Sequence, residues 1–195
     1  MTAYSARYEA ALILAAKAHR TQVRKGGDVP YIVHPVHVST ILLRHGCSED
    51  EIVAGLLHDV VEDQDVPLQE IEAEFGPSVA EIVAALTERK KAAGAKRPWE
   101  ERKRESLDQL HQASIQAVTV KAADALHSAR SLAHDLERDG AVIWRNFSRG
   151  PGPTLWYYRS LGAIVRERLR HHPLAGELAE AIQHLEQVMT TTGNN

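Results

Sequence analysis

Apolar residues recur every three or four positions along almost the whole chain, which is the spacing of an amphipathic helix. The first such segment spans residues 6–20. Its small apolar residues fall on one side of a helix, at Ala11, Leu12, Ala15, Ala16 and Ala18. No segment alternates apolar and polar residues in the way that is typical of a strand. The pattern therefore predicts an all-α fold.

Turn and capping residues divide this pattern into roughly eight to ten helices. Ser48, with Glu51 three residues later, forms a capping-box motif that begins a helix running to residue 63. His58 and Asp59 are accordingly expected well inside that helix. Another helix is expected to begin near Pro35, since proline is tolerated in a first turn. Further helices are predicted at residues 67–75, 77–91, 99–113, 114–140, 154–169 and 174–190.

The composition favours one helical domain. The chain has 195 residues, of which 44% are hydrophobic and 25% charged, so we expect a single domain over 1–195 with a C-terminal helical extension at 172–195. A net charge of −3 weakens any case for nucleic-acid or membrane-surface binding. Cys47 is alone, which excludes an intrachain disulfide and a cysteine-rich zinc site. Since there is no cleavable signal and no apolar run of membrane-spanning length, a cytoplasmic location is expected.

One short segment, LLHDVVED at residues 56–63, combines a histidine and three carboxylates with leucines and valines. Charged groups avoid apolar surroundings unless something compensates them, and a divalent cation would do so. On a helix, Glu62 lies one turn from His58 and Asp63 one turn from Asp59. Adjacent helical residues point about 100° apart, so His58 and Asp59 can share a metal only at their common edge. Other segments must then supply further ligands.

Two ionisable residues elsewhere in the chain also lie among apolar residues. His34 lies at a loop-to-helix junction in PYIVHPVHV, and Asp124 lies among small apolar residues in VTVKAADALHSARSL. The candidate ligands are thus His34, His58, Asp59 and Asp124. Mixed nitrogen and oxygen donors suit Mn²⁺, Fe²⁺ or Zn²⁺ and chemistry on phosphate esters. The acid pair at 62–63 would be free to act on water. An alternative is that Asp124 caps a helix or pairs with Lys121.

The order of these motifs resembles the HD-domain metal phosphohydrolases. More narrowly, RKGGDVPYIVHP, AGLLHDVVED, FGPSVAEIVAALTE and VKAADALHSARSL resemble the hydrolase domain of the RelA/SpoT alarmone family, over roughly residues 6–165. We expect no synthetase domain to follow. The chain is therefore similar in layout to the stand-alone small alarmone hydrolases, such as the metazoan SpoT homologue.

The resemblance implies an HD-domain helical bundle in which the four candidate ligands bind one Mn²⁺, with Fe²⁺ or Zn²⁺ as alternatives. It implies that Glu62 and Asp63 assist attack by water, which removes the 3′-diphosphate of (p)ppGpp as pyrophosphate. Arg24 and Lys25 would lie against the base and phosphates of this small-molecule substrate, and Tyr157 would line the nucleotide site. Ser128, which stands where the family often has asparagine, would contact the nucleotide through a shorter side chain that offers no amide.

Several alternatives remain open from the sequence. The same site is compatible with (p)ppApp or with an NADPH phosphatase activity, and a non-catalytic nucleotide sensor is an alternative of another class. His37 is interpreted as a packing residue beside the site, and the second HD dipeptide, His134-Asp135, as a surface feature. The basic loop at 90–103 offers the cations Lys96, Arg97, Arg102 and Lys103 for phosphate. The sequence indicates neither the oligomeric state nor the role of the C-terminal helix.

Overall fold

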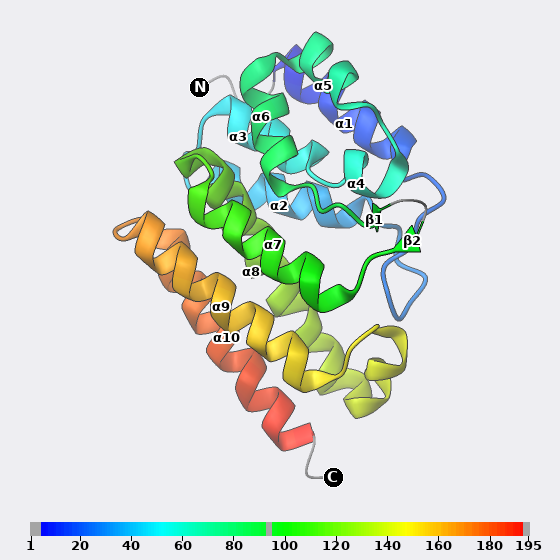
Figure 1. Cartoon of the computed structure of the whole chain (residues 1–195), viewed down its shortest axis with the longest axis vertical. Helices are drawn as coiled ribbons and strands as arrows, with labels where there is room; N and C mark the ends of the chain where they lie inside the picture. Colours follow the sequence, from blue (N-terminus) through cyan, green and yellow to red (C-terminus); the bar gives the residue numbers. More distant parts are fainter. Residues whose placement is uncertain (1–4, 93–94, 193–195) are drawn as a thin grey trace.

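The structure, a computed structural model, describes residues 5–92 and 95–192. Over these residues it contains ten α-helices, one 3₁₀ helix and a two-stranded hairpin, which confirms the all-α fold (Figure 1). The helices are α1 (Ala6–Ala18), α2 (Val33–Arg44), α3 (Glu49–Leu57), α4 (Val60–Gln64), α5 (Leu68–Phe75), α6 (Pro77–Leu86), α7 (Trp99–Gln112), α8 (Ile115–Asp139), α9 (Pro151–Leu169) and α10 (Pro173–Thr192). The remaining elements are β1 (Lys91–Ala92), β2 (Ala95–Lys96) and the 3₁₀ helix η1 (Gly140–Asn146).

Local sequence signals account for most helix ends. The Ser48 side chain accepts a hydrogen bond from the Glu51 backbone N–H, and the Glu51 side chain accepts one from the Ser48 backbone, so the capping box is formed. Ser114 caps α8 in the same way. The helix predicted at 77–91 is shorter than expected, because the chain leaves α6 after Leu86 and turns into the β1–β2 hairpin, in which Lys91 pairs with Lys96.

The prediction that His58 and Asp59 lie well inside one helix is wrong. Helix α3 ends at Leu57 and α4 begins at Val60, so the two residues form the junction. In a continuous helix their side chains would diverge by about 100°. At the junction, Nε2 of His58 and Oδ2 of Asp59 lie 3.1 Å apart. The break thereby directs both side chains to one point.

Helix α8 runs through the middle of the fold and contacts α2, α3, α6, α9 and α10. In Figure 1, α1 to α6 form one end of the molecule, α9 and α10 lie along the other part of α8, and α7 packs against α6 and α9. Gly55 lets α3 lie close to α2, since a Cβ there would come within 2.6 Å of Leu42. The buried side of α10, including Leu174, Leu178 and Leu185, belongs to the same continuous core. We therefore propose that the chain forms one domain that includes α10.

Across the residues described, none of the helices has the length and apolar character needed to cross a bilayer.

Candidate metal and phosphate site

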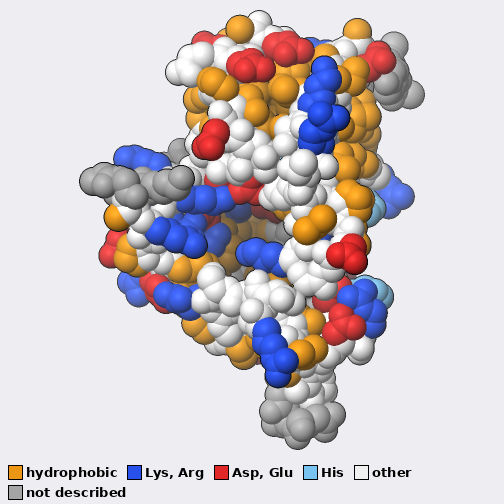
Figure 2. All heavy atoms as spheres, turned by 90° about the vertical axis from the view of Figure 1, so that its right-hand side faces the viewer, with side chains coloured by type: hydrophobic (Ala, Val, Ile, Leu, Met, Phe, Trp, Pro, Cys, Tyr) orange, Lys and Arg blue, Asp and Glu red, His pale blue; other side chains and the backbone are white. Residues whose placement is uncertain are grey.

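A cleft of about 700 Å³ opens where the segment after α1, the α3–α4 junction, α7, α8 and α9 meet. Figure 2 shows this hollow surrounded by lysine and arginine side chains, with acidic side chains on one wall. Its volume is in the range of sites that hold small molecules. All ten candidate site residues line it: Arg24, Lys25, His34, His58, Asp59, Glu62, Asp63, Asp124, Ser128 and Tyr157.

Three of the candidate ligands come together on the floor of the cleft. His34, His58 and Asp59 each direct one ligand atom to a region where these atoms lie within 4.8 Å of one another. Nε2 of His34 is 3.2 Å from Nε2 of His58 and 3.6 Å from Oδ2 of Asp59. His34 and His58 are almost fully buried. Among the described residues, these three form the group of side chains that could hold a metal ion.

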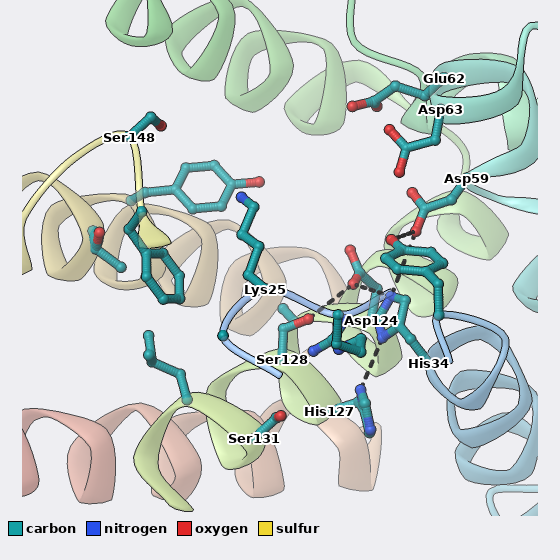
Figure 3. Close-up of a pocket in the computed structure, with 18 of the residues that line it drawn as sticks. Lys25, His34, Asp59, Glu62, Asp63, Asp124, His127, Ser128, Ser131 and Ser148 are labelled. Carbon is teal, nitrogen blue, oxygen red and sulfur yellow. Dashed lines mark hydrogen bonds and ion pairs between the residues drawn. The ribbon is translucent and has the colours of Figure 1, made fainter. Parts of the chain in front are cut away.

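Asp124 reaches the same place from α8. Its Oδ1 lies 3.3 Å from Nε2 of His34 and 3.9 Å from Nε2 of His58 (Figure 3). Its Oδ2 accepts a hydrogen bond of 2.8 Å from the Lys121 ammonium. The pairing with Lys121 is therefore real, but it uses the oxygen that does not face the imidazoles. Asp124 can contact a cation through Oδ1 while Lys121 holds its other oxygen.

The donor set fits a divalent cation. The Nδ1–H of His58 donates to the Gly55 carbonyl at 2.9 Å, and a carbonyl can only accept. The lone pair of His58 is therefore on Nε2, which faces the cluster. Burial alone would lower the pKa of His58, but Asp59 and Asp124 raise it to about 9. The two carboxylates, Asp59 and Asp124, thus stabilise a positive charge at this point, which a proton or a metal ion can supply.

Tyr31 is a part of the site that the sequence reasoning missed. Its hydroxyl donates a hydrogen bond of 2.5 Å to Oδ2 of Asp59. Burial, and then the Asp59 charge, raise the pKa of Tyr31 far above its usual range, so the hydroxyl keeps its proton. The ring packs against the buried ring of His19, with centroids 4.8 Å apart. Tyr31 thereby holds the Asp59 carboxylate in one orientation.

The acid pair lies beside this cluster on α4, with both carboxylates directed into the cleft (Figure 3). Glu62 accepts a 2.9 Å hydrogen bond from the Glu88 backbone N–H and lies 3.0 Å from the Lys90 ammonium. Asp63 also pairs with Lys90 and accepts a 2.9 Å hydrogen bond from the Gln22 amide. Burial raises the pKa of Glu62, and Lys90 partly offsets this effect. Glu62 is thus a carboxylate poised to take up a proton.

Arg24 and Lys25 enter the cleft from the loop that follows α1. The Arg24 guanidinium is 5.8 Å from the centroid of the Tyr31 ring, and the Lys25 ammonium is 5.5 Å from that of Phe147. Burial, and next the charge of Lys103, lower the pKa of Lys25. These cations therefore lie in a region of positive charge that favours an anionic ligand.

Ser128 and Tyr157 occupy different parts of the wall. The Ser128 hydroxyl donates to Oδ1 of Asp124 over 3.4 Å, so this residue contacts a candidate ligand. The Tyr157 hydroxyl is buried and has no hydrogen-bond partner among the described residues. The Lys103 ammonium lies 4.4 Å above the Tyr157 ring. Tyr157 and Lys103 thus contact each other in the wall of the cleft.

The basic loop at residues 90–103 directs only some of its cations into the cleft. Arg102 and Lys103 line the cleft, and both pair with the buried carboxylate of Glu88. Lys96 is exposed in β2, and Arg97 pairs with Glu105 outside the cleft. Within this segment, the cations that line the cleft are thus Lys90 and those of α7, and not Lys96 or Arg97.

Two further histidines on α8, His127 and His134, differ in their relation to the site. His127 lies between His34 and His37 and hydrogen-bonds to both rings. Burial, and then His34, lower the pKa of His127 to about 3, so its ring is neutral. The His134 of the second HD dipeptide is exposed and does not line the cleft, although Asp135 lines it at a distance from the ligand cluster. His127 carried no sequence signal, since a histidine on an apolar helix face is common in a core.

Comparison with known proteins gives the class. The profile of the HD domain matches residues 11–149. A guanosine-3′,5′-bis(diphosphate) 3′-pyrophosphohydrolase MESH1 of Drosophila melanogaster is 39% identical over 131 residues, which cover 66% of this chain and 70% of that protein. The zebrafish protein of the same name is 41% identical over 121 residues, or 60% of this chain and 64% of that protein. A Myxococcus xanthus GTP pyrophosphokinase is 38% identical, and the match covers only 18% of its length.

Solved structures agree in fold. A metazoan ortholog of SpoT, described as hydrolysing ppGpp and acting in starvation responses, has a TM-score of 0.74 and 31% identity, covering 94% of this chain and 97% of that one. A Listeria monocytogenes protein has a TM-score of 0.68 and 32% identity, covering 77% of this chain and 96% of that one. The chain belongs to the HD-domain family, and its relatives within that family include RelA/SpoT-type alarmone hydrolases. The family implies a divalent metal.

Proposed function

We propose that this protein hydrolyses the 3′-diphosphate of (p)ppGpp-type alarmones and releases pyrophosphate, with one Mn²⁺ bound by the four candidate ligands. The observation that carries the proposal is the convergence of His34, His58, Asp59 and Asp124 beside the acid pair, in a cleft lined by cations. Relatives that share this chain's fold bear names that state the same activity.

The chemistry explains why these groups belong together. A diphosphate repels hydroxide, and a divalent cation at this site would lower the pKa of water from 15.7 toward roughly 7 and neutralise phosphate charge. Glu62 accepts the proton of the attacking water, since its carboxylate is buried and faces the cleft. Asp63 orients that water or protonates the leaving oxygen. The Lys90 ammonium pairs with both carboxylates, and its charge partly offsets the effect of burial on the pKa of Glu62.

The rest of the substrate meets the cationic wall. Arg24, Lys25 and Lys103 lie in the cleft, where their charges stabilise phosphate groups. The aromatic rings of Tyr31 and Tyr157 lie beside these cations and offer flat surfaces for a base. The Ser128 hydroxyl donates to Asp124 and can still accept a hydrogen bond, so base choice depends on Ser128 and on the loop around Arg24.

A substrate panel tests the proposal. Purified protein is treated with EDTA, supplied with Mn²⁺ or left without it, and given ppGpp, ppApp or NADPH. We expect Mn²⁺-dependent pyrophosphate release from ppGpp. Release from ppApp alone, or orthophosphate release from NADPH alone, would move the activity to another substrate. Tight binding of ppGpp with no product at any metal concentration would instead identify a sensor.

Replacement of Lys90 by methionine should shift the acidic limb of the pH profile of kcat, where activity falls as the pH is lowered, to higher pH. Glu62 must be deprotonated to accept a proton, so activity is lost as the pH falls through its pKa. Removing the Lys90 ammonium takes away the charge that lowers this pKa, so the limb moves upward and kcat at neutral pH falls. The measurement is kcat for pyrophosphate release between pH 5 and 9. Lys96→Met, which removes an exposed charge, should leave the limb in place.

A further inference from the structure

A row of histidine rings leads from the candidate metal site to the surface. Nδ1 of the buried His34 lies 2.8 Å from Nδ1 of His127. Nε2 of His127 lies 3.1 Å from Nδ1 of His37, which is exposed. Figure 3 shows His34 and His127 joined in this way. The row uses both nitrogens of His34 and His127, because Nε2 of His34 faces His58.

Each neutral ring carries one N–H and one lone pair, so these contacts constrain one another. If the lone pair of His34 is on Nε2, its proton is on Nδ1 and must be donated to Nδ1 of His127. His127 then carries its proton on Nε2 and donates it to Nδ1 of His37. The opposite arrangement would place a proton on Nε2 of His34, where a ligand needs a lone pair. Only one direction of the row is therefore compatible with metal binding.

His58 shows why His34 needs such a row. The Nδ1–H of His58 donates to the Gly55 carbonyl, which can only accept, so that single contact sets its tautomer. The partner of Nδ1 in His34 is another imidazole, which can donate or accept. One contact therefore does not settle the tautomer of His34. A second contact, from His127 to His37, adds a hydrogen bond in the direction that metal binding requires when Nδ1 of His37 accepts.

We propose that His127 and His37 are positioning residues that hold His34 in the tautomer whose Nε2 binds the metal. The inference rests on the proposed function only through the presence of a metal site. Groups that orient a ligating histidine change metal affinity by roughly 10- to 100-fold when they are removed.

Variants of His127 separate the effect of its hydrogen-bond acceptor from the effect of the volume of its ring. In His127→Asn, the side-chain oxygen takes the place of Nδ1 and can still accept from His34. In His127→Leu, the acceptor is lost. We expect the Leu variant to bind Mn²⁺ about 10- to 100-fold more weakly, and the Asn variant to stay within about threefold of the unchanged protein. The affinity is measured by electron paramagnetic resonance of free Mn²⁺, with no substrate present.

His134→Leu is the matched control, because His134 is exposed on the same helix and lies outside the cleft. Its Mn²⁺ affinity should not change. Equal affinities for the Leu variant and the unchanged protein would overturn the inference. Equal weakening in the Leu and Asn variants, with both folded by circular dichroism, would overturn it as well.

A spectroscopic readout covers the case in which the Leu variant does not fold. Two-bond ¹H–¹⁵N correlation spectra distinguish the tautomers of a histidine ring. In the unchanged protein loaded with diamagnetic Zn²⁺, we expect the proton of His34 on Nδ1 and that of His127 on Nε2. A proton on Nδ1 of His127 would contradict the proposed direction. Absence of Mn²⁺ and Zn²⁺ binding by the unchanged protein would instead count against the proposed function and, with it, the role of the row.

Discussion

Replacement of Asp59 by asparagine should abolish Mn²⁺-dependent pyrophosphate release, with a loss of at least roughly three orders of magnitude. Asp59 lies 3.1 Å from His58, and its carboxylate is one of the two that face both imidazoles. Burial would raise the pKa of Asp59, but His58 lowers it below the usual range, so the group is a carboxylate. Asparagine keeps the shape and loses the charge that a metal needs.

The fold should survive this change, because the asparagine oxygen can still accept the hydrogen bond from Tyr31. Mn²⁺ affinity and pyrophosphate release are measured on the same sample, and both should fall. Asp65→Asn is the control: Asp65 is exposed, six residues further on, in a left-handed conformation that asparagine tolerates. If Asp59→Asn bound Mn²⁺ as well as the unchanged protein, Asp59 would not be a ligand.

The second large effect is expected for Glu62→Gln. Glutamine fills the same space and can accept the hydrogen bond from the Glu88 backbone, but it cannot take up a proton. We expect kcat to fall by roughly two to four orders of magnitude, as for loss of a positioned acid or base. Mn²⁺ affinity and the binding of ppGpp should change little, since Glu62 is not among the candidate ligands.

Glu70→Gln serves as the control for this variant, because Glu70 is exposed on α5 and outside the cleft. The two quantities to compare are kcat and KM for ppGpp at saturating Mn²⁺. A Glu62→Gln enzyme with unchanged kcat would show that another group accepts the proton. A parallel loss of Mn²⁺ affinity would show that Glu62 acts through the metal instead.

Much of the fold could be predicted because it depends on local signals. The period of the apolar residues identifies the helices, and Ser48 and Ser114 mark the N-terminal ends of α3 and α8. The break at His58 and Asp59 has no such signal, since the sequence around it remains helical in pattern. The break brings the two side chains to one point, and that contact is a tertiary property that the local pattern does not encode.

The site divides in the same way. Ionisable residues among leucines and valines stand out in a sequence, and the family resemblance adds the order in which they occur. Tyr31, Lys90 and His127 do not stand out, because each owes its place to a contact with a residue far away in the chain. The packing of the helices brings each of these residues to its partner, and local sequence patterns do not encode that packing.

The most direct test of the account is anomalous diffraction from crystals grown with Mn²⁺. We expect one strong peak in the cleft, bonded to Nε2 of His34, Nε2 of His58 and the carboxylates of Asp59 and Asp124. A cleft with these four side chains well ordered and no peak between them, while Mn²⁺ supports activity, would contradict the account.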